Sequence, residues 1–151
     1  MKDCIFCKIV KGEIPSAKIW EDSTHIAILD ILPNVRGQGL VIPKKHEPSY
    51  VFDIDDENYK KLLLAAKTAG KLLDKALGSA RTAMVAEGME VDHAHIKLYP
   101  LYHKQSKVFE PATAKQEVFF DKYAGYVTSQ HGPKANFEEL KRLAEKIRKA
   151  N

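Results

Sequence analysis

The chain has 151 residues, of which 44% are hydrophobic and 29% charged, the composition of a globular protein rather than a disordered one. We therefore expect residues 1–151 to form a single domain. No apolar run approaches the length of a membrane span, and the first residues contain no signal-peptide apolar region, so we expect a cytoplasmic protein without a membrane partner. Much of the net charge of +4 lies near the C-terminus, where basic residues alternate with glutamate. This pattern favours a solvated helix face over a nucleic-acid-binding surface.

Three strands are expected in the first third of the chain, after a short N-terminal turn. Residues 18–22 and 25–30 have strand-like sequences and are separated by Ser23-Thr24, which predicts a hairpin. Residues 33–37 read as a loop. Residues 39–42 then predict a third strand, which Pro43 stops.

Two helices and two further strands are expected in the remainder. The first helix can be capped by Asp55 or Asp56 and ends at Gly78. The second begins at Asn136, with Glu139 three residues on as a capping partner. The residues expected to face the core are Tyr59, Leu62, Leu63, Ala66, Ala69, Gly70, Leu73 and Leu77 in the first helix, and Phe137, Leu140, Leu143 and Ile147 in the second. Strands are predicted at residues 82–87 and 93–99. The pattern is that of an α+β domain built on an antiparallel sheet, with a long central helix and a C-terminal helix; residues 104–133 fit no clear pattern.

The most informative segment is residues 91–100, VDHAHIKLYP, because His93, His95 and Lys97 occupy alternate positions. Side chains two residues apart in a strand point to the same side, so these three are expected to share a face, with the apolar residues between them packed behind. Two imidazoles and a cation suit an anionic ligand, a metal, or a nucleophile that attacks phosphate. The structural alternative is a polar strand face in solvent.

The only two cysteines form a Cys4-x-x-Cys7 pair. In a chain without an export signal, this spacing suggests metal binding or redox chemistry before a structural disulfide. Two thiolates are half of a zinc site, since structural Zn²⁺ usually takes four ligands. His46 and His93 are the candidates to complete it, and the alternative is that both cysteines are small buried residues.

Taken together, the segments Cys4–Ile9, Gly12–Pro15, Asp30-Ile31, Leu40–His46 and His93–Pro100 closely resemble the histidine triad (HIT) family of nucleotide hydrolases and transferases. The resemblance covers about two thirds of the chain. It implies a HIT-like fold and a homodimer formed through the central helix and a sheet edge. It also implies a nucleotide substrate, with a purine nucleotide expected.

By this resemblance, His95 is the nucleophile that attacks the α-phosphate of a nucleotide and forms a nucleotidyl-histidine, which water or another acceptor resolves. Asp30 would bind the ribose hydroxyls. The residues that align with the walls of the base pocket are Phe6, Ile9, Ile14 and Ile31. Apolar walls predict loose base specificity, and for these four residues the alternative is an ordinary core position.

Some members of this family bind zinc through two cysteines and two histidines, and here the matching residues are Cys4, Cys7, His46 and His93. All four are present, so the resemblance predicts structural Zn²⁺ that pins the N-terminal segment beside the catalytic strand. His25, His103 and His131 match no family position, and surface or core histidine is the expectation for each.

Three polar positions depart from the family pattern. Lys97 replaces the third motif histidine, Gln38 replaces a histidine near the third strand, and Glu90 stands where a serine commonly contacts phosphate. Lys97 and Gln38 can donate to phosphate oxygens and are therefore candidate catalytic residues. An ionised Glu90 would repel the substrate unless it were paired, for example with Lys97.

These departures leave two main functions open. The first is a nucleotide hydrolase or nucleotidyltransferase that uses His95. The second is a nucleotide-binding or regulatory module with the same fold and little turnover. The nucleotide derivative is also open: a phosphoramidate, a dinucleoside polyphosphate, a nucleotidyl sugar or an adenylated nucleic-acid end. The last is the least favoured, because the chain carries no basic extension.

Overall fold

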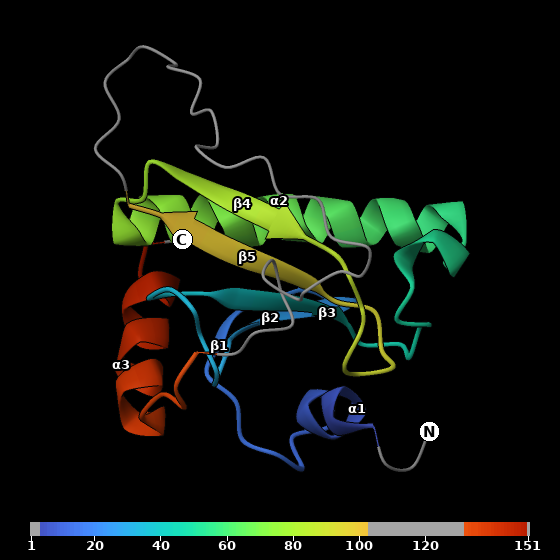
Figure 1. The fold of residues 1–151 in the computed structure, drawn as a ribbon, viewed down its shortest axis with the longest axis horizontal. Coiled ribbons are helices and arrows are strands. Elements are labelled where there is room, and N and C mark those ends of the chain that lie inside the picture. The colour runs from blue at the N-terminus through green and yellow to red at the C-terminus, as the bar shows by residue number, and fades with distance from the viewer. Residues whose placement is uncertain (1–3, 103–131, 151) are drawn as a thin grey trace, which may run out of the picture.

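The computed structural model describes residues 4–102 and 132–150, and within them it confirms the expected α+β fold (Figure 1). The elements in chain order are α1 (Ile5–Val10), β1 (Lys18–Glu21), β2 (His25–Leu29), β3 (Gly39–Pro43), a 3-10 turn (Val51–Asp53), α2 (Asp56–Leu77), β4 (Arg81–Val85), β5 (Ile96–Leu101) and α3 (Phe137–Arg148). Over the same residues, no helix is both long and apolar enough to cross a membrane.

The five strands form one antiparallel sheet in the order β1-β2-β3-β5-β4. The helices α2 and α3 pack on one face, and α1 lies on the other side of the sheet (Figure 1). Strands β2 and β3 are buried along their whole length. Their alternate residues enter two cores, the larger beneath α2 and α3 and a smaller one beneath α1. The small core beneath α1 matters for function because it forms the floor of the candidate site.

Both long helices begin where the sequence indicates, and α2 also ends there. Asp55 caps α2 by accepting a hydrogen bond from the Asn58 N–H at 3.0 Å, and Gly78 ends the helix with φ +66°, a left-handed conformation that suits glycine. Asn136 caps α3 by accepting from the N–H groups of Glu138 and Glu139. Most buried positions follow the expected stripes, but Ala65 and Leu72 in α2 and Ala144 in α3 are also buried and were not predicted.

Several boundaries differ from the expectation. Strands β1 and β2 each end one residue earlier than expected, and β3 includes Pro43. The N-terminal turn contains a short helix, α1, and β4 spans Arg81–Val85 instead of residues 82–87. Strand β5 begins at Ile96, not at residue 93, because its ladder with β3 stops at the Val41–Ile96 pair and Pro43 has no N–H to continue it. The Ala94 N–H instead donates to the Glu47 carbonyl at 3.0 Å. Most of residues 104–133 lies outside the described residues.

Candidate functional site

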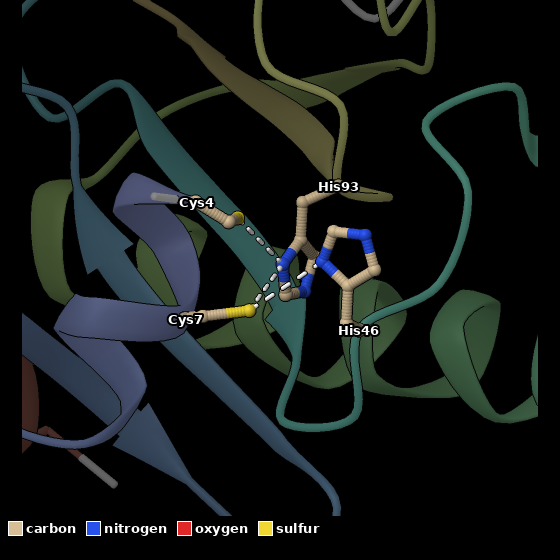
Figure 2. A group of neighbouring side chains, drawn as sticks. All are labelled: Cys4, Cys7, His46 and His93. Atoms are coloured by element: carbon tan, nitrogen blue, oxygen red, sulfur yellow. Dashed lines mark hydrogen bonds between the residues drawn. The ribbon is translucent and has the colours of Figure 1, made fainter. Parts of the chain in front are cut away.

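Cys4, Cys7, His46 and His93 form a compact cluster between α1, the loop after β3 and the segment before β5 (Figure 2). Their sulfur and nitrogen ligand atoms all lie within 4.8 Å of one another. The Nδ1 atom of His93 is 3.3 Å from Sγ of Cys4 and 3.5 Å from Sγ of Cys7, and Nδ1 of His46 is 3.4 Å from Sγ of Cys7. Ligands of a tetrahedral zinc site are about 3.3–3.8 Å apart, given bond lengths of about 2.0–2.3 Å. The expected four residues therefore come together at close to the spacing that zinc needs.

The protonation of this cluster also suits a metal. The Nε2–H of His93 donates to the Pro43 carbonyl at 2.8 Å, since a carbonyl can only accept. That bond leaves the lone pair of Nδ1 directed at the two sulfurs, and many metal-binding histidines are oriented in the same way by a carbonyl that accepts from the other ring nitrogen. Burial and the neighbouring Cys4 raise the pKa of the Cys7 thiol. A dication would reverse that effect by stabilising the thiolate, so the donor set fits Zn²⁺ chemically.

Next to the cluster, a pocket of about 230 Å³ opens between α1, the end of β2 and the start of β5. All five residues predicted to bind the nucleoside line this pocket, together with His95 and Lys97; the five are Phe6, Ile9, Ile14, Asp30 and Ile31. Glu90 also lines it, whereas Gln38 does not. A larger cavity of about 510 Å³, between residues 33–37 and α3, contains none of the predicted site residues.

His95 is 4% exposed and is held by a hydrogen bond from its Nδ1–H to the His93 carbonyl, at 2.9 Å. Because the carbonyl requires Nδ1 to carry the proton, the neutral ring keeps its lone pair on Nε2. The Phe6 ring packs edge-on against His95, with the ring centroids 5.1 Å apart. Burial lowers the pKa of His95, and the charge of Lys97 lowers it further. The imidazole is therefore kept neutral, which is the form that can act as a nucleophile.

Asp30 reaches the pocket with both carboxylate oxygens already oriented by the protein. Oδ1 accepts from the Leu32 N–H at 2.9 Å, and Oδ2 accepts from Nε2 of Gln38 at 2.8 Å. Gln38 is itself fixed, because its Oε1 accepts from the Asn34 N–H at 2.8 Å. The sequence did not indicate this contact between Gln38 and Asp30. It places Gln38 behind the candidate ribose-binding carboxylate.

Lys97 is 5% exposed and forms an ion pair with Glu87, whose Oε1 lies 3.2 Å from Nζ. Sequence reasoning missed Glu87 and suggested Glu90 as the partner of Lys97. The signal for Glu87 lies in the strand register, because Val85 pairs with Lys97 and Glu87 follows two residues later. That register cannot be read from the sequence before the sheet is known.

Of the three unassigned histidines, His25 is a buried residue, 3% exposed, on the first position of β2. Its Nδ1 lies 2.8 Å from Oγ1 of Thr24, and burial lowers its pKa. His25 lies outside both the cluster and the nucleotide pocket. His103 and His131 lie outside the described residues.

Comparison with known proteins gives one consistent result. A model of the HIT domain matches residues 11–104. The adenosine 5′-monophosphoramidase of Saccharomyces cerevisiae is 40% identical over 121 residues, which are 79% of this chain and 75% of that protein.

Solved structures agree with the sequence comparison. A crystal structure of a Hit-like protein from Bartonella henselae has a TM-score of 0.73 at 26% identity, covering 100% of this chain and 98% of that chain. A Zn-bound histidine triad family protein from Mycobacterium smegmatis has a TM-score of 0.69 at 22% identity, covering 99% of this chain and 93% of that one. The second likeness bears on the fold alone.

Proposed function

Because this chain belongs to the HIT domain family, we propose that it hydrolyses or transfers nucleotides by cleaving at the α-phosphate, with His95 as the nucleophile. The observation that carries the proposal is that His95, fixed as its Nδ1–H tautomer, lines the same pocket as the Asp30 carboxylate. A nucleotide bound with its ribose at Asp30 and its α-phosphate at His95 would occupy that pocket.

The nucleoside end would be held mainly by apolar contact. Phe6, Ile9, Ile14 and Ile31 would enclose the base, and walls of this kind give little discrimination between bases. Asp30 would accept hydrogen bonds from the ribose hydroxyls. Its orientation by Leu32 and Gln38 lowers the entropy lost when the ribose binds. We expect purine nucleotides to bind best because their larger rings cover more apolar surface.

The reaction would proceed in two displacements. In the first, the lone pair on Nε2 of His95 forms an N–P bond, and the bond from phosphorus to the leaving group breaks with its electron pair going to that group. In the second, water or another acceptor attacks the phosphorus of the nucleotidyl-histidine and loses a proton to the solvent, and the P–N bond breaks with its electron pair returning to Nε2. Dividing one difficult displacement into two lowers each barrier. The hydrogen bond from His95 to the His93 carbonyl would keep the ring in one orientation through both steps.

We propose that Cys4, Cys7, His46 and His93 hold a structural Zn²⁺, which would fix α1 against the start of β5. The fixed elements matter to the pocket because Phe6, between the two cysteines, contacts the rings of both His93 and His95. His93 would bind the metal through its side chain, and its carbonyl would hold the ring of His95.

We also propose that the chain forms a homodimer. The support is the family resemblance together with two exposed apolar side chains, Leu64 on α2 at 62% and Met84 on the edge strand β4 at 51%. Sedimentation at micromolar concentration tests this, and a clean monomer would remove the proposal.

A specific observation favours a second function, that of a nucleotide-binding module with little turnover. Two of the altered polar residues already bond to protein acceptors, Gln38 to Asp30 and Lys97 to Glu87. If neither reached the phosphate, binding would persist while the chemistry slowed.

The deciding experiment is an incubation of the purified protein with nucleoside phosphoramidates, dinucleoside polyphosphates, nucleotidyl sugars and adenylated oligonucleotides, scored for released nucleoside monophosphate. Turnover of at least one derivative supports the enzyme, and the derivative with the highest kcat/KM identifies the leaving group. Tight binding of the monophosphate without turnover of any derivative supports the module instead.

A further inference from the structure

Lys97 is a long, flexible cation at the position where the HIT family has the rigid imidazole of its third motif histidine. Four side-chain torsions must be fixed to hold its ammonium in one position, which costs conformational entropy. A buried cation without a counter-charge also loses its favourable hydration. A lysine that replaces histidine at this position therefore needs a nearby group that both fixes and balances its charge.

Glu87 meets both needs. Its Oε1 lies 3.2 Å from Nζ of Lys97, and the two side chains are only 14% and 7% exposed. Water therefore screens this pair far less than it screens an exposed one. The pair adds no net charge, so a buried ammonium can be kept beside His95 without a large electrostatic cost to the fold.

The two partners are placed differently relative to the pocket. Lys97 lines it, whereas Glu87 is not among the lining residues. A substrate phosphate would therefore meet the ammonium, with the carboxylate held back from it. An ammonium has three N–H donors, so an ion pair with Glu87 is compatible with a further hydrogen bond to a phosphate oxygen.

The backbone around Glu87 is itself restrained. Strand β4 ends at Val85, which pairs with Lys97, and three residues later Gly88 has φ +68°. At Gly88 the backbone passes so close to the Ser49 carbonyl that an added Cβ would collide with it. The backbone at this position therefore requires glycine, which restrains the segment that carries Glu87.

We propose that Glu87 is a positioning residue, which holds the Lys97 ammonium at the phosphate end of the pocket and contributes to catalysis only through that lysine. The inference rests on the proposed function of the pocket. During the first displacement an N–P bond forms at His95 and the bond to the leaving group breaks. The negative charge on the phosphoryl oxygens is then stabilised by Lys97, which stays protonated throughout. Glu87 neither contacts the substrate nor exchanges a proton.

The test is a double-mutant cycle on the full chain with its metal bound, comparing Glu87→Gln, Lys97→Met and the double variant. We expect Glu87→Gln to lower kcat/KM about tenfold to a hundredfold, and Lys97→Met to lower it by up to about a thousandfold. In the Lys97→Met background, Glu87→Gln should change kcat/KM by less than about twofold, because the group it positions is gone.

A second background makes the test specific to lysine. Lys97→His restores the family residue, whose shorter side chain has fewer torsions to fix. There Glu87→Gln should again have less than about a twofold effect. The matched control is the exposed ion pair of Glu57 and Lys60 on α2, 3.0 Å apart, where Glu57→Gln should leave kcat/KM unchanged. If Glu87→Gln were silent in the unmodified protein, or lowered kcat/KM equally in all three backgrounds, the positioning role would be overturned.

A binding measurement separates this inference from the proposed function. Lys97 should strengthen binding of a nucleoside monophosphate relative to the matching nucleoside, and Glu87→Gln should reduce that ratio severalfold while leaving nucleoside affinity unchanged. This result is expected even if no derivative is turned over. If the protein turned over a derivative, but Glu87→Gln left the affinity ratio unchanged and showed no coupling to Lys97 in the double-mutant cycle, the proposed function would be retained and the role of Glu87 rejected.

Discussion

The cysteine–histidine cluster and the phosphate end of the pocket are adjacent, yet they differ in how their side chains are held. In the cluster, four residues direct their own ligand atoms at one point. At the part of the pocket proposed to bind phosphate, the residues are oriented by protein partners: His95 by the His93 carbonyl and Lys97 by Glu87. The candidate metal ligands are thus brought together by their own ligand atoms, whereas the proposed reaction site depends equally on residues that would not touch the substrate.

His93 belongs to both regions. Its Nδ1 atom lies in the cluster, its Nε2–H donates to Pro43, and its carbonyl holds His95. Metal at the cluster would therefore fix the residue that orients His95, the proposed nucleophile. Substituting residues in each region separately shows how far the cluster and the pocket depend on one another.

The largest effect is expected from His95→Ala. Removing the nucleophile should lower kcat by about a thousandfold or more, because the remaining contacts bind the substrate without supplying an attacking atom. Nucleoside monophosphate affinity should change little, since Asp30 and the apolar walls are intact. Steady-state kinetics and calorimetry measure the two quantities. His25→Gln removes a buried imidazole outside the pocket and is the control; full activity in His95→Ala would rule out the covalent route.

The next effect is expected at the cluster. Protein purified without chelator should carry about one zinc per chain, and Cys4→Ser should lose it. Because metal bound to the folded state adds to the free energy of unfolding, the variant should also melt at a lower temperature. Elemental analysis and thermal unfolding measure these changes, with His25→Gln again as the control that keeps its zinc. Absence of zinc from the unmodified protein, with both thiols freely titratable, would return Cys4 and Cys7 to the role of small packing residues.

A smaller effect is expected from Gln38→Ala, which separates two roles for this residue. If Gln38 orients Asp30, its loss should weaken binding of nucleoside and nucleoside monophosphate by the same factor, about fivefold to tenfold. If it contacts the phosphate instead, only the monophosphate should bind more weakly. Calorimetric titration of both ligands distinguishes the two, and equal affinities in variant and unmodified protein would assign Gln38 neither role.

The smallest effect concerns pH and His25. Burial lowers its pKa in the folded protein, so the unfolded chain binds more protons between that value and about 6.5. The stability contributed by neutral His25 is therefore complete above pH 7 and is lost as the pH falls through 6.5. Between pH 8 and pH 5, the Tm of zinc-loaded His25→Gln should fall by a few degrees less than the Tm of the unmodified protein. Parallel Tm curves for the two proteins from pH 5 to pH 8 would contradict this.

The sequence was sufficient for features that depend on residue type and spacing. Helix caps at Asp55 and Asn136 follow from local chemistry that the fold preserves. The alternation around His95 also placed Ala94, Ile96 and Leu98 in the large core. These predictions succeeded because each rests on a short-range rule, whereas the four metal-ligand candidates were identified by residue type and by the family resemblance.

Other features could not be predicted because they depend on which strands become neighbours. The partner of Lys97 is set by the pairing of β4 with β5, and that of Gln38 by the return of the chain beside Asp30. The start of β5 was wrong by three residues because the loss of a hydrogen-bond donor at Pro43, on another strand, ends the ladder. Long-range register decides each of these cases, and spacing within one segment does not reveal it.

Transfer of a nucleotidyl group to His95, the step on which the proposed mechanism depends, can be tested by trapping the nucleotidyl-histidine intermediate. The protein is mixed with its best substrate, quenched in alkaline denaturant within one turnover, digested, and analysed by mass spectrometry. We predict one nucleotidyl group on the peptide that contains His95, with fragmentation placing it on that imidazole, and none in His95→Ala. Turnover without any labelled peptide in the unmodified protein, together with retained turnover in His95→Ala, would contradict the claim and assign the chemistry to a direct attack by water.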